Sequence, residues 1–189
     1  MKRLLLAAAF SAAVLLGQDF KLGSTVGDFA LGDLAGTPVR FASLRGPVTV
    51  VTFVSVQCPV SNSYNGRMNA IYKDYGARGV KFVFVNANRT EPAAQVAEHA
   101  KQNFAFPVYK DGNNVVADRF GASVTPEAFV IDSTGVVRYH GSIDDAMDIR
   151  RVQEQRLRNA LDAVLAGKTV ERAETKAFGC TIKRVKREP

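Results

Sequence analysis

Two apolar runs constrain this chain more than any other feature: VTVVTFVSV at residues 48–56 and VKFVFVNA at residues 80–87. Both are rich in β-branched residues and lack regular polar alternation, which is typical of strands buried on both faces of a sheet. Between them, aromatic and aliphatic residues recur at steps of three and four from Tyr64 to Tyr75, which predicts a helix. Two strands joined through a helix must run parallel, so the sequence predicts an α/β fold.

The rest of the chain adds antiparallel strands to this unit. Two β-rich segments flank the turn STG and predict a hairpin. The sequence therefore predicts a mixed central sheet with helices on both faces. The further expected elements, in chain order, are short strands and turns in 19–47, a helix at 96–104, a strand at 106–111, a helix at 113–121, hairpin strands at 126–132 and 136–141, and a helix from Ile149 to a C-cap at Gly167.

The first residues, MKRLLLAAAFSAAVLLGQDF, have a basic start followed by a largely apolar stretch of 13 residues from Leu4 to Leu16. That stretch is too short to span a bilayer and suits the core of a signal peptide. We expect residues 1–18 to be a signal peptide cleaved near Gly17, residues 19–167 to form one folded domain, and residues 168–189 to be a basic tail that carries Cys180. The protein is then periplasmic or secreted, with no stable membrane span after cleavage. An uncleaved anchor and a buried N-terminal helix are the alternatives.

The net charge of +7 lies mainly in that tail, where seven Lys and Arg residues face three acidic residues from Lys168 onward. No aromatic residues interleave with the charges, as base stacking would require. We expect a solvated basic tail and no nucleic-acid partner.

Cys58 lies where the first buried strand ends and the first helix begins. Free N–H groups at a helix start favour a thiolate, and they lower the pKa of a cysteine below its usual value of about 8.5. Pro59 suits the first helical turn, because its missing N–H has no partner there. The hydroxyl of Ser61, three residues on, is expected to donate a hydrogen bond to the sulfur. These features indicate a redox-active nucleophile, and a buried structural cysteine is the plainer alternative.

With the segment VTPEAFVID, this arrangement resembles the thioredoxin-fold redoxins, in particular the peroxiredoxin-like AhpC/TSA-type branch, over about residues 24–183. The resemblance implies a thioredoxin-like fold and a cis bond at Thr125-Pro126 facing the reactive Cys58. In that family the pair shapes a groove for substrate backbone, to which we also assign Pro59. The segment FGCTIKR at 178–184 resembles the tail of the same branch.

The chain also departs from the family patterns. Ser61 stands where thioredoxins carry a second cysteine, and Val51 stands where peroxiredoxins carry a proline. Ser55 fits the Thr or Ser that precedes the peroxiredoxin cysteine by three places. Glu127 follows the Thr-Pro pair on the strand from which peroxiredoxins bring an arginine to Cys58, and neither Arg67 nor Arg138 matches that position. We therefore favour thiol-disulfide exchange as the function. Thiol peroxidase activity is the first alternative.

Cys180 is the only other cysteine. It is expected to resolve a mixed disulfide on Cys58, since a thiolate that attacks a disulfide stays trapped until a second thiol displaces it. A bridge to another molecule and a free tail thiol remain open. The expected partners are a protein or small-molecule disulfide or thiol and a reductant protein, with a peroxide as the partner under the peroxidase alternative. No cofactor is expected.

A second alternative is non-catalytic binding of copper or of a partner protein. His140 could join Cys58 and Cys180 in a soft copper(I) or zinc site, although the spacing is not a recognised ligand pattern, and our site assignment includes no metal. His99 is expected on the surface, and Asp144 and Asp145 are expected to cap the last helix.

Overall fold

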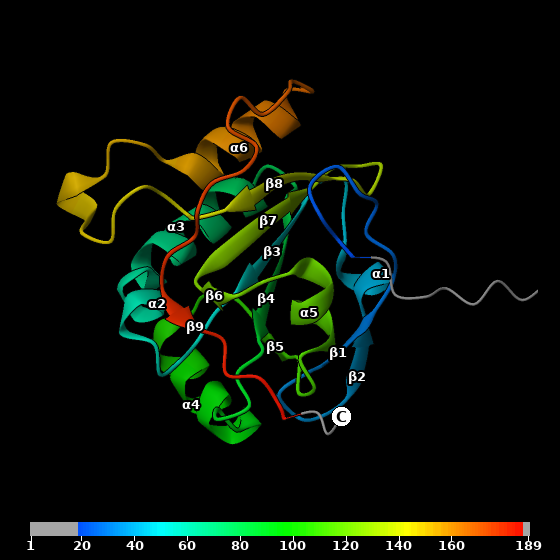
Figure 1. The fold of residues 1–189 in the computed structure, drawn as a ribbon, viewed down its shortest axis with the longest axis vertical. Helices are drawn as coiled ribbons and strands as arrows, with labels where there is room; N and C mark the ends of the chain where they lie inside the picture. Colours follow the sequence, from blue (N-terminus) through cyan, green and yellow to red (C-terminus); the bar gives the residue numbers. More distant parts are fainter. Residues whose placement is uncertain (1–18, 187–189) are drawn as a thin grey trace, which may run out of the picture.

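The structure, a computed structural model, describes residues 19–186 (Figure 1). The signal peptide expected at 1–18 lies outside the described residues. A central sheet of seven strands has the order β2-β1-β5-β4-β3-β7-β8, and β6 and β9 form a separate pair. The strands are β1 (Ala30–Gly32), β2 (Pro38–Arg40), β3 (Thr49–Phe53), β4 (Lys81–Asn86), β5 (Val108–Lys110), β6 (Val124–Thr125), β7 (Glu127–Ile131), β8 (Val137–Gly141) and β9 (Cys180–Thr181). The helices are α1 (Phe41–Leu44), α2 (Pro59–Ser63), α3 (Asn65–Gly76), α4 (Ala93–Asn103), α5 (Val115–Phe120), α6 (Arg156–Leu165) and the 3-10 helix η1 (Ile149–Arg151).

Strand β3 lies inside the sheet, where it pairs parallel with β4 and antiparallel with β7. All five of its residues are buried, as its run of β-branched and apolar residues predicts. The parallel pair is joined through α2 and α3, and β8 continues the sheet as the second strand of the hairpin. The predicted thioredoxin-like α/β fold with a mixed sheet is confirmed.

The two faces of the sheet carry two separate apolar clusters. Val50 of β3 packs in a cluster with residues of α3, α4 and α6. Its neighbour Val51 packs in the other cluster, with residues of α1 and α5. Successive side chains of a strand point to opposite faces, so a doubly covered strand carries apolar residues on both of them. Helices therefore cover both faces, as predicted (Figure 1).

The last helix is shorter than predicted. The helix α6 begins only at Arg156, and Ile149 lies in η1 with 65% of its surface exposed. The carboxylate of Asp145 accepts hydrogen bonds from the backbone N–H groups of Gln153 and Glu154, which holds the preceding segment as a loop. The periodic apolar residues at 149 and 152 therefore lie outside α6. Gly167, with a left-handed φ of 67°, follows the C-cap residue Ala166 and ends the helix as predicted.

After α6 the tail returns along the molecule. Backbone hydrogen bonds join His140 to Ala173 and Thr175, so the tail first follows the edge of β8. It then crosses to β6, where the red strand β9 lies between α2 and β6 (Figure 1). The boundary placed between residues 167 and 168 stays a prediction. None of the helices within residues 19–186 is long and apolar enough to cross a membrane.

Candidate active site

Cys58 lies just beyond the carboxyl end of β3, as the N-cap residue of α2. Its side chain is buried, and the N–H of Ser61 donates a hydrogen bond to its sulfur over 3.2 Å. Pro59 occupies the first helical position, as predicted. The helix α2 is a single short helix that breaks at Tyr64 before α3 begins. Polarisation of the sulfur therefore comes chiefly from one local N–H group rather than from a long helix dipole.

The hydroxyl of Ser61 does not contact the sulfur, contrary to the prediction. It accepts a hydrogen bond from the N–H of Ser55 over 3.1 Å. The side chain of Ser61 therefore braces the loop before Cys58, and only its backbone faces the sulfur. Ser55 braces the same loop from the other side, because its hydroxyl accepts the N–H of Cys58 over 3.0 Å.

Behind this loop lies a buried carboxylate that the sequence analysis did not identify. Glu91, which is 2% exposed, accepts hydrogen bonds from the hydroxyl of Ser55 over 2.5 Å and from the backbone N–H groups of Val56 and Gln57. The amide of Asn86 donates a further hydrogen bond. One carboxylate thus holds each of the three residues that precede Cys58. A buried charge is tolerated where several donors surround it in this way.

The ammonium group of Lys110 completes this network. It donates to the side-chain oxygen of Asn86 and to the backbone oxygens of Asn88 and Glu91. Burial lowers the pKa of Lys110, and the negative charge of Glu91 opposes that shift. One signal could have revealed Glu91: it follows β4, whose carboxyl end is adjacent to that of β3 in a parallel pair. Polar residues after neighbouring parallel strands meet at one edge of the sheet.

Cys180 pairs with Cys58. Their sulfur atoms are 2.50 Å apart and their Cα atoms 5.8 Å apart, within the range of about 4.4–6.8 Å that a disulfide needs. Of the three alternatives left open for Cys180, the structure shows the pairing with Cys58. The tail brings Cys180 to this place because β9 pairs antiparallel with β6, with Cys180 opposite Thr125.

The peptide bond between Thr125 and Pro126 is cis, as the resemblance implied. The backbone oxygen of Thr125 lies 3.4 Å from the sulfur of Cys58. The Thr-Pro pair therefore adjoins the cysteine, and its role in a substrate groove stays a prediction. Its backbone edge is not open, however, since β9 of the same chain already pairs with β6 there.

Glu127 does not face the disulfide as the peroxiredoxin arginine would. Its carboxylate accepts the N–H groups of Ser123 and Val124 and lies 2.6 Å from the ring nitrogen of His140. The two arginines considered from the sequence are bound elsewhere. Arg67 bonds to Asp144 and Arg138 to Asp132, so neither supplies a positive charge to Cys58.

The structure also places the two histidines. The ring of His140 stacks on Phe129, and His99 is half-buried against Phe104 rather than on the surface as expected. Within residues 19–186, no group of three or more His, Cys, Asp or Glu side chains could hold a metal ion. The proposed ligand set of His140 with both cysteines is therefore not assembled.

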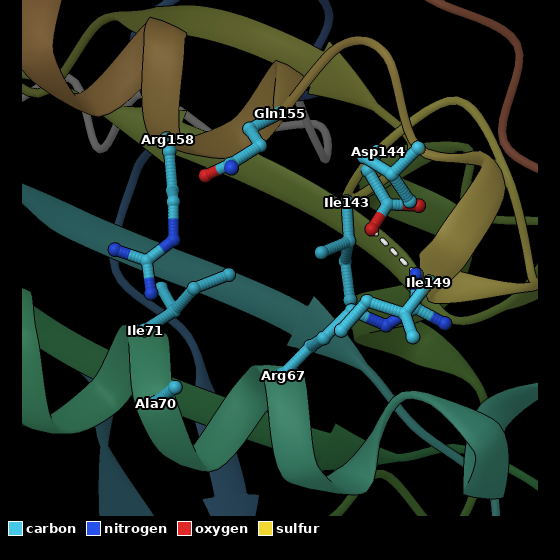
Figure 2. A pocket seen from close by; sticks show the side chains of 9 residues that line it. Arg67, Ala70, Ile71, Ile143, Asp144, Ile149, Gln155 and Arg158 are labelled. Atoms are coloured by element: carbon cyan, nitrogen blue, oxygen red, sulfur yellow. Dashed lines mark hydrogen bonds and ion pairs between the residues drawn. The ribbon is translucent and has the colours of Figure 1, made fainter.

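A cavity of about 450 Å³ lies beside the site, between α3 and the segment from Ile143 to Arg158 (Figure 2). Figure 2 shows Arg67 reaching from α3 toward Asp144, with which it forms an ion pair of 2.6 Å. The hydroxyl of Tyr64 donates to the same carboxylate, and burial together with that contact raises the pKa of Tyr64. Asp144 therefore anchors the loop to α3 and does not cap the last helix, contrary to the prediction. Neither cysteine lines the cavity.

Comparison with known proteins places this geometry in a family context. The model of the AhpC/TSA family matches residues 22–140. The thiol-disulfide oxidoreductase ResA of Geobacillus thermodenitrificans is 31% identical over 118 residues, which are 62% of this chain and 67% of the relative.

Two solved structures resemble nearly the whole chain. A hypothetical protein from Sinorhizobium meliloti has a TM-score of 0.79 and 32% identity, covering 89% of this chain and 97% of its own. An uncharacterized conserved protein from Geobacillus kaustophilus has a TM-score of 0.82 and 27% identity, covering 89% and 95%.

Proposed function

The chain belongs to the AhpC/TSA family, and from that premise we propose that it is a thiol-disulfide oxidoreductase in which Cys58 is the nucleophile and Cys180 the resolving thiol. The observation that carries this proposal is the position of the two sulfurs. The sulfur of Cys58 lies beyond the carboxyl end of β3 and accepts a hydrogen bond from the N–H of Ser61. The returning tail brings the sulfur of Cys180 into contact with it. The activity class of the relatives supports the same assignment.

The first step is the attack of reduced Cys58 on a substrate disulfide. The thiolate sulfur forms a bond to one substrate sulfur, the substrate disulfide breaks, and the other substrate sulfur leaves as a thiolate. The N–H of Ser61 lies where it stabilises the anionic sulfur of Cys58 before the attack. Ser55 holds the N–H of Cys58 and so orients this loop. Thr125, Pro126 and Pro59 frame the space from which the substrate arrives.

The second step releases the substrate. The thiolate of Cys180 attacks the sulfur of Cys58, the mixed disulfide breaks, and the remaining substrate sulfur leaves as a thiolate. The product is the disulfide between Cys58 and Cys180. Two electrons have then passed from the protein to the substrate. A dithiol reductant must return them before another cycle, and the reverse sequence would oxidise a substrate dithiol.

A trapping experiment tests both roles. The reduced Cys180→Ser variant is mixed with a peptide disulfide, and its mass is measured without reduction. We expect a stable adduct of one peptide on Cys58, because the resolving thiol is missing. The wild-type protein should instead accumulate its internal disulfide. An unmodified Cys180→Ser protein under these conditions would overturn the proposal, and Cys58→Ser serves as the negative control.

Export of the protein remains part of this proposal. A disulfide between Cys58 and Cys180 is stable in an oxidising compartment, and the expected signal peptide at 1–18 would direct the chain there. The mass of the protein isolated from its native source tests this. A mature chain that begins near residue 18 supports export to the periplasm or medium, and an intact start at Met1 contradicts the cleavage.

A further inference from the structure

We propose that tail residues 179–183 occupy the substrate groove as an internal pseudo-substrate, and that the groove selects extended peptides matching them. On this basis, a preferred substrate has a small residue immediately before its cysteine and a branched aliphatic residue two places after it. The inference rests on the proposed function of Cys58.

The backbone of the tail is the first support. The strand β9 pairs antiparallel with β6, so that Cys180 faces Thr125 and Thr181 faces Val124. One residue further, the N–H of Ile182 donates to the backbone oxygen of Ser123 over 2.9 Å. The segment before the cis-proline is thus a strand edge that β9 covers, and such an edge binds an extended strand by main-chain hydrogen bonds. Those bonds carry no sequence information, so selection has to come from side chains.

The position before the cysteine selects for size. Gly179 lies so close to the groove wall that an added Cβ would overlap the backbone oxygen of Thr125 and approach the nitrogen of Pro126. Its conformation does not require glycine, because its φ is not in the left-handed region. Glycine is therefore needed here for close approach of two backbones. A substrate in the same register meets the same wall.

The position two residues after the cysteine selects for an apolar side chain. Ile182 is buried and joins the cluster formed by α1, α5 and one face of the sheet. Burial of such a side chain stabilises the bound strand, because its apolar surface is removed from water. Thr181, between Cys180 and Ile182, is exposed, as expected for alternate residues of a strand. The groove thus contacts the side chains at alternate positions of the bound strand.

The anchoring beyond Ile182 is lighter and more polar. The backbone oxygen of Lys183 accepts the N–H of Arg89, and its own N–H donates to the side-chain oxygen of Asn88. The side chain of Lys183 is exposed. Arg184 forms an ion pair with Asp118 over 3.2 Å. Such partly exposed pairs contribute little free energy. The disulfide and the buried Ile182 therefore hold the tail most strongly, and reduction removes the first of these.

A peptide panel tests the selection. The reference peptide has the sequence of residues 177–184, with its cysteine linked by a disulfide to thionitrobenzoate. Cys58 of the reduced full chain attacks the peptide sulfur, the thionitrobenzoate thiolate leaves, and its absorbance gives the rate. We expect aspartate in place of the isoleucine, or alanine in place of the glycine, to lower the second-order rate constant by roughly tenfold or more. The matched control places aspartate at the threonine, whose counterpart is exposed, and should change the rate less than about threefold.

Variants of the tail test whether the tail occupies the groove. In the reduced full chain, Gly179→Ala and Ile182→Asp should each raise the rate with the reference peptide by roughly tenfold, since they free a groove that is otherwise filled. Lys176→Asp, an exposed tail residue before the groove, is the control and should leave the rate unchanged. Gly179 is itself exposed, so its variant remains informative if Ile182→Asp does not fold.

The outcomes separate the inference from the proposed function. If every peptide reacts at the same rate, or the tail variants react like the wild type, the pseudo-substrate inference is overturned while the function of Cys58 stands. If no peptide releases thionitrobenzoate from any variant, the proposed function is wrong, and the inference fails with it.

Discussion

Two loops at opposite ends of the central sheet are each organised by one carboxylate. At the carboxyl end of β3, Glu91 accepts the N–H groups of Val56 and Gln57 and the hydroxyl of Ser55. At the other end, in the turn between β7 and β8, Asp132 accepts the N–H groups of Thr134 and Val136. Ionised carboxylates provide strong acceptors for such loops, because bonds to charged groups exceed those between neutral groups.

The two carboxylates differ in what surrounds them. Asp132 has Arg138 beside it in a partly exposed hairpin turn. Glu91 is fully enclosed, and its loop ends at the disulfide. The same hydrogen-bonding device therefore stabilises a turn at one end and positions a reactive sulfur at the other. Reactivity should depend on the Glu91 end alone, and stability on both.

The largest expected effect is a difference in exchange rate between variants at the two ends of the sheet. Cys58→Ser should abolish exchange with a peptide disulfide, because a hydroxyl does not replace the thiolate nucleophile. Asp132→Asn should retain the exchange rate of the wild type within about twofold, since a surface change far from a site rarely alters it. Release of thionitrobenzoate from an activated peptide measures both. A large loss of exchange rate in Asp132→Asn would show that reactivity does not depend on the Glu91 end alone.

Glu91→Gln should give the next largest effect. The amide keeps the shape of the side chain but turns an NH₂ group toward N–H donors, so we expect a loss of about 2–3 kcal/mol in the free energy of unfolding. The Cys58 loop should also loosen, which we expect to slow the reaction of its thiol. Urea unfolding and the rate of Cys58 alkylation measure these two quantities.

The exposed Glu98→Gln, on helix α4, is the matched control and should change neither. An unchanged alkylation rate in a destabilised Glu91→Gln protein would make Glu91 a structural residue only, as Asp132 is.

A smaller, pH-dependent effect is expected at Asp132. Burial disfavours its charge, but hydrogen bonds from Thr134, Arg138 and Val136 outweigh burial and lower its pKa from 3.8 to about 2. A carboxyl whose pKa is lowered by folding stabilises the protein above the unfolded value, and that contribution disappears as the pH falls through the folded value.

Asp132→Asn should therefore cost about 1–2 kcal/mol at pH 7, after allowance for solvent screening, and the cost should shrink between pH 4 and pH 2. Urea midpoints measured across this range test it. A cost independent of pH would show that the charge of Asp132 contributes nothing.

The smallest expected effect concerns peroxide. The environment of Cys58 includes neither Arg67 nor Arg138, and the neighbouring strand carries Glu127. Without a positive charge to polarise the peroxide, reduced Cys58 should react with hydrogen peroxide no more than about tenfold faster than free cysteine. Trapping of the sulfenic acid with time measures the rate. A much faster reaction would favour the thiol peroxidase alternative and would add peroxide reduction to the reactions of Cys58.

Local sequence patterns were sufficient to predict those parts of the fold that depend on neighbouring residues. The unbroken apolar run around Val51 specifies a strand covered on both faces, and Pro59 marks the first turn of the helix after Cys58. The family resemblance identified the cis bond before Pro126. Periodicity failed at Ile149, because the contacts of Asp144 and Asp145 hold that segment as a loop.

Only the tertiary structure decided what meets at the disulfide. Glu91 is far from Cys58 along the chain, and its carboxylate reaches the Cys58 loop because β3 and β4 lie side by side. Cys180 reaches Cys58 because the tail returns to β6, where Gly179 permits contact and Ile182 finds an apolar pocket. A sequence pattern reports what each residue prefers locally. Which distant residues share a site depends on strand order and on the path of the tail, and those are set by the burial and hydrogen bonding of the whole chain.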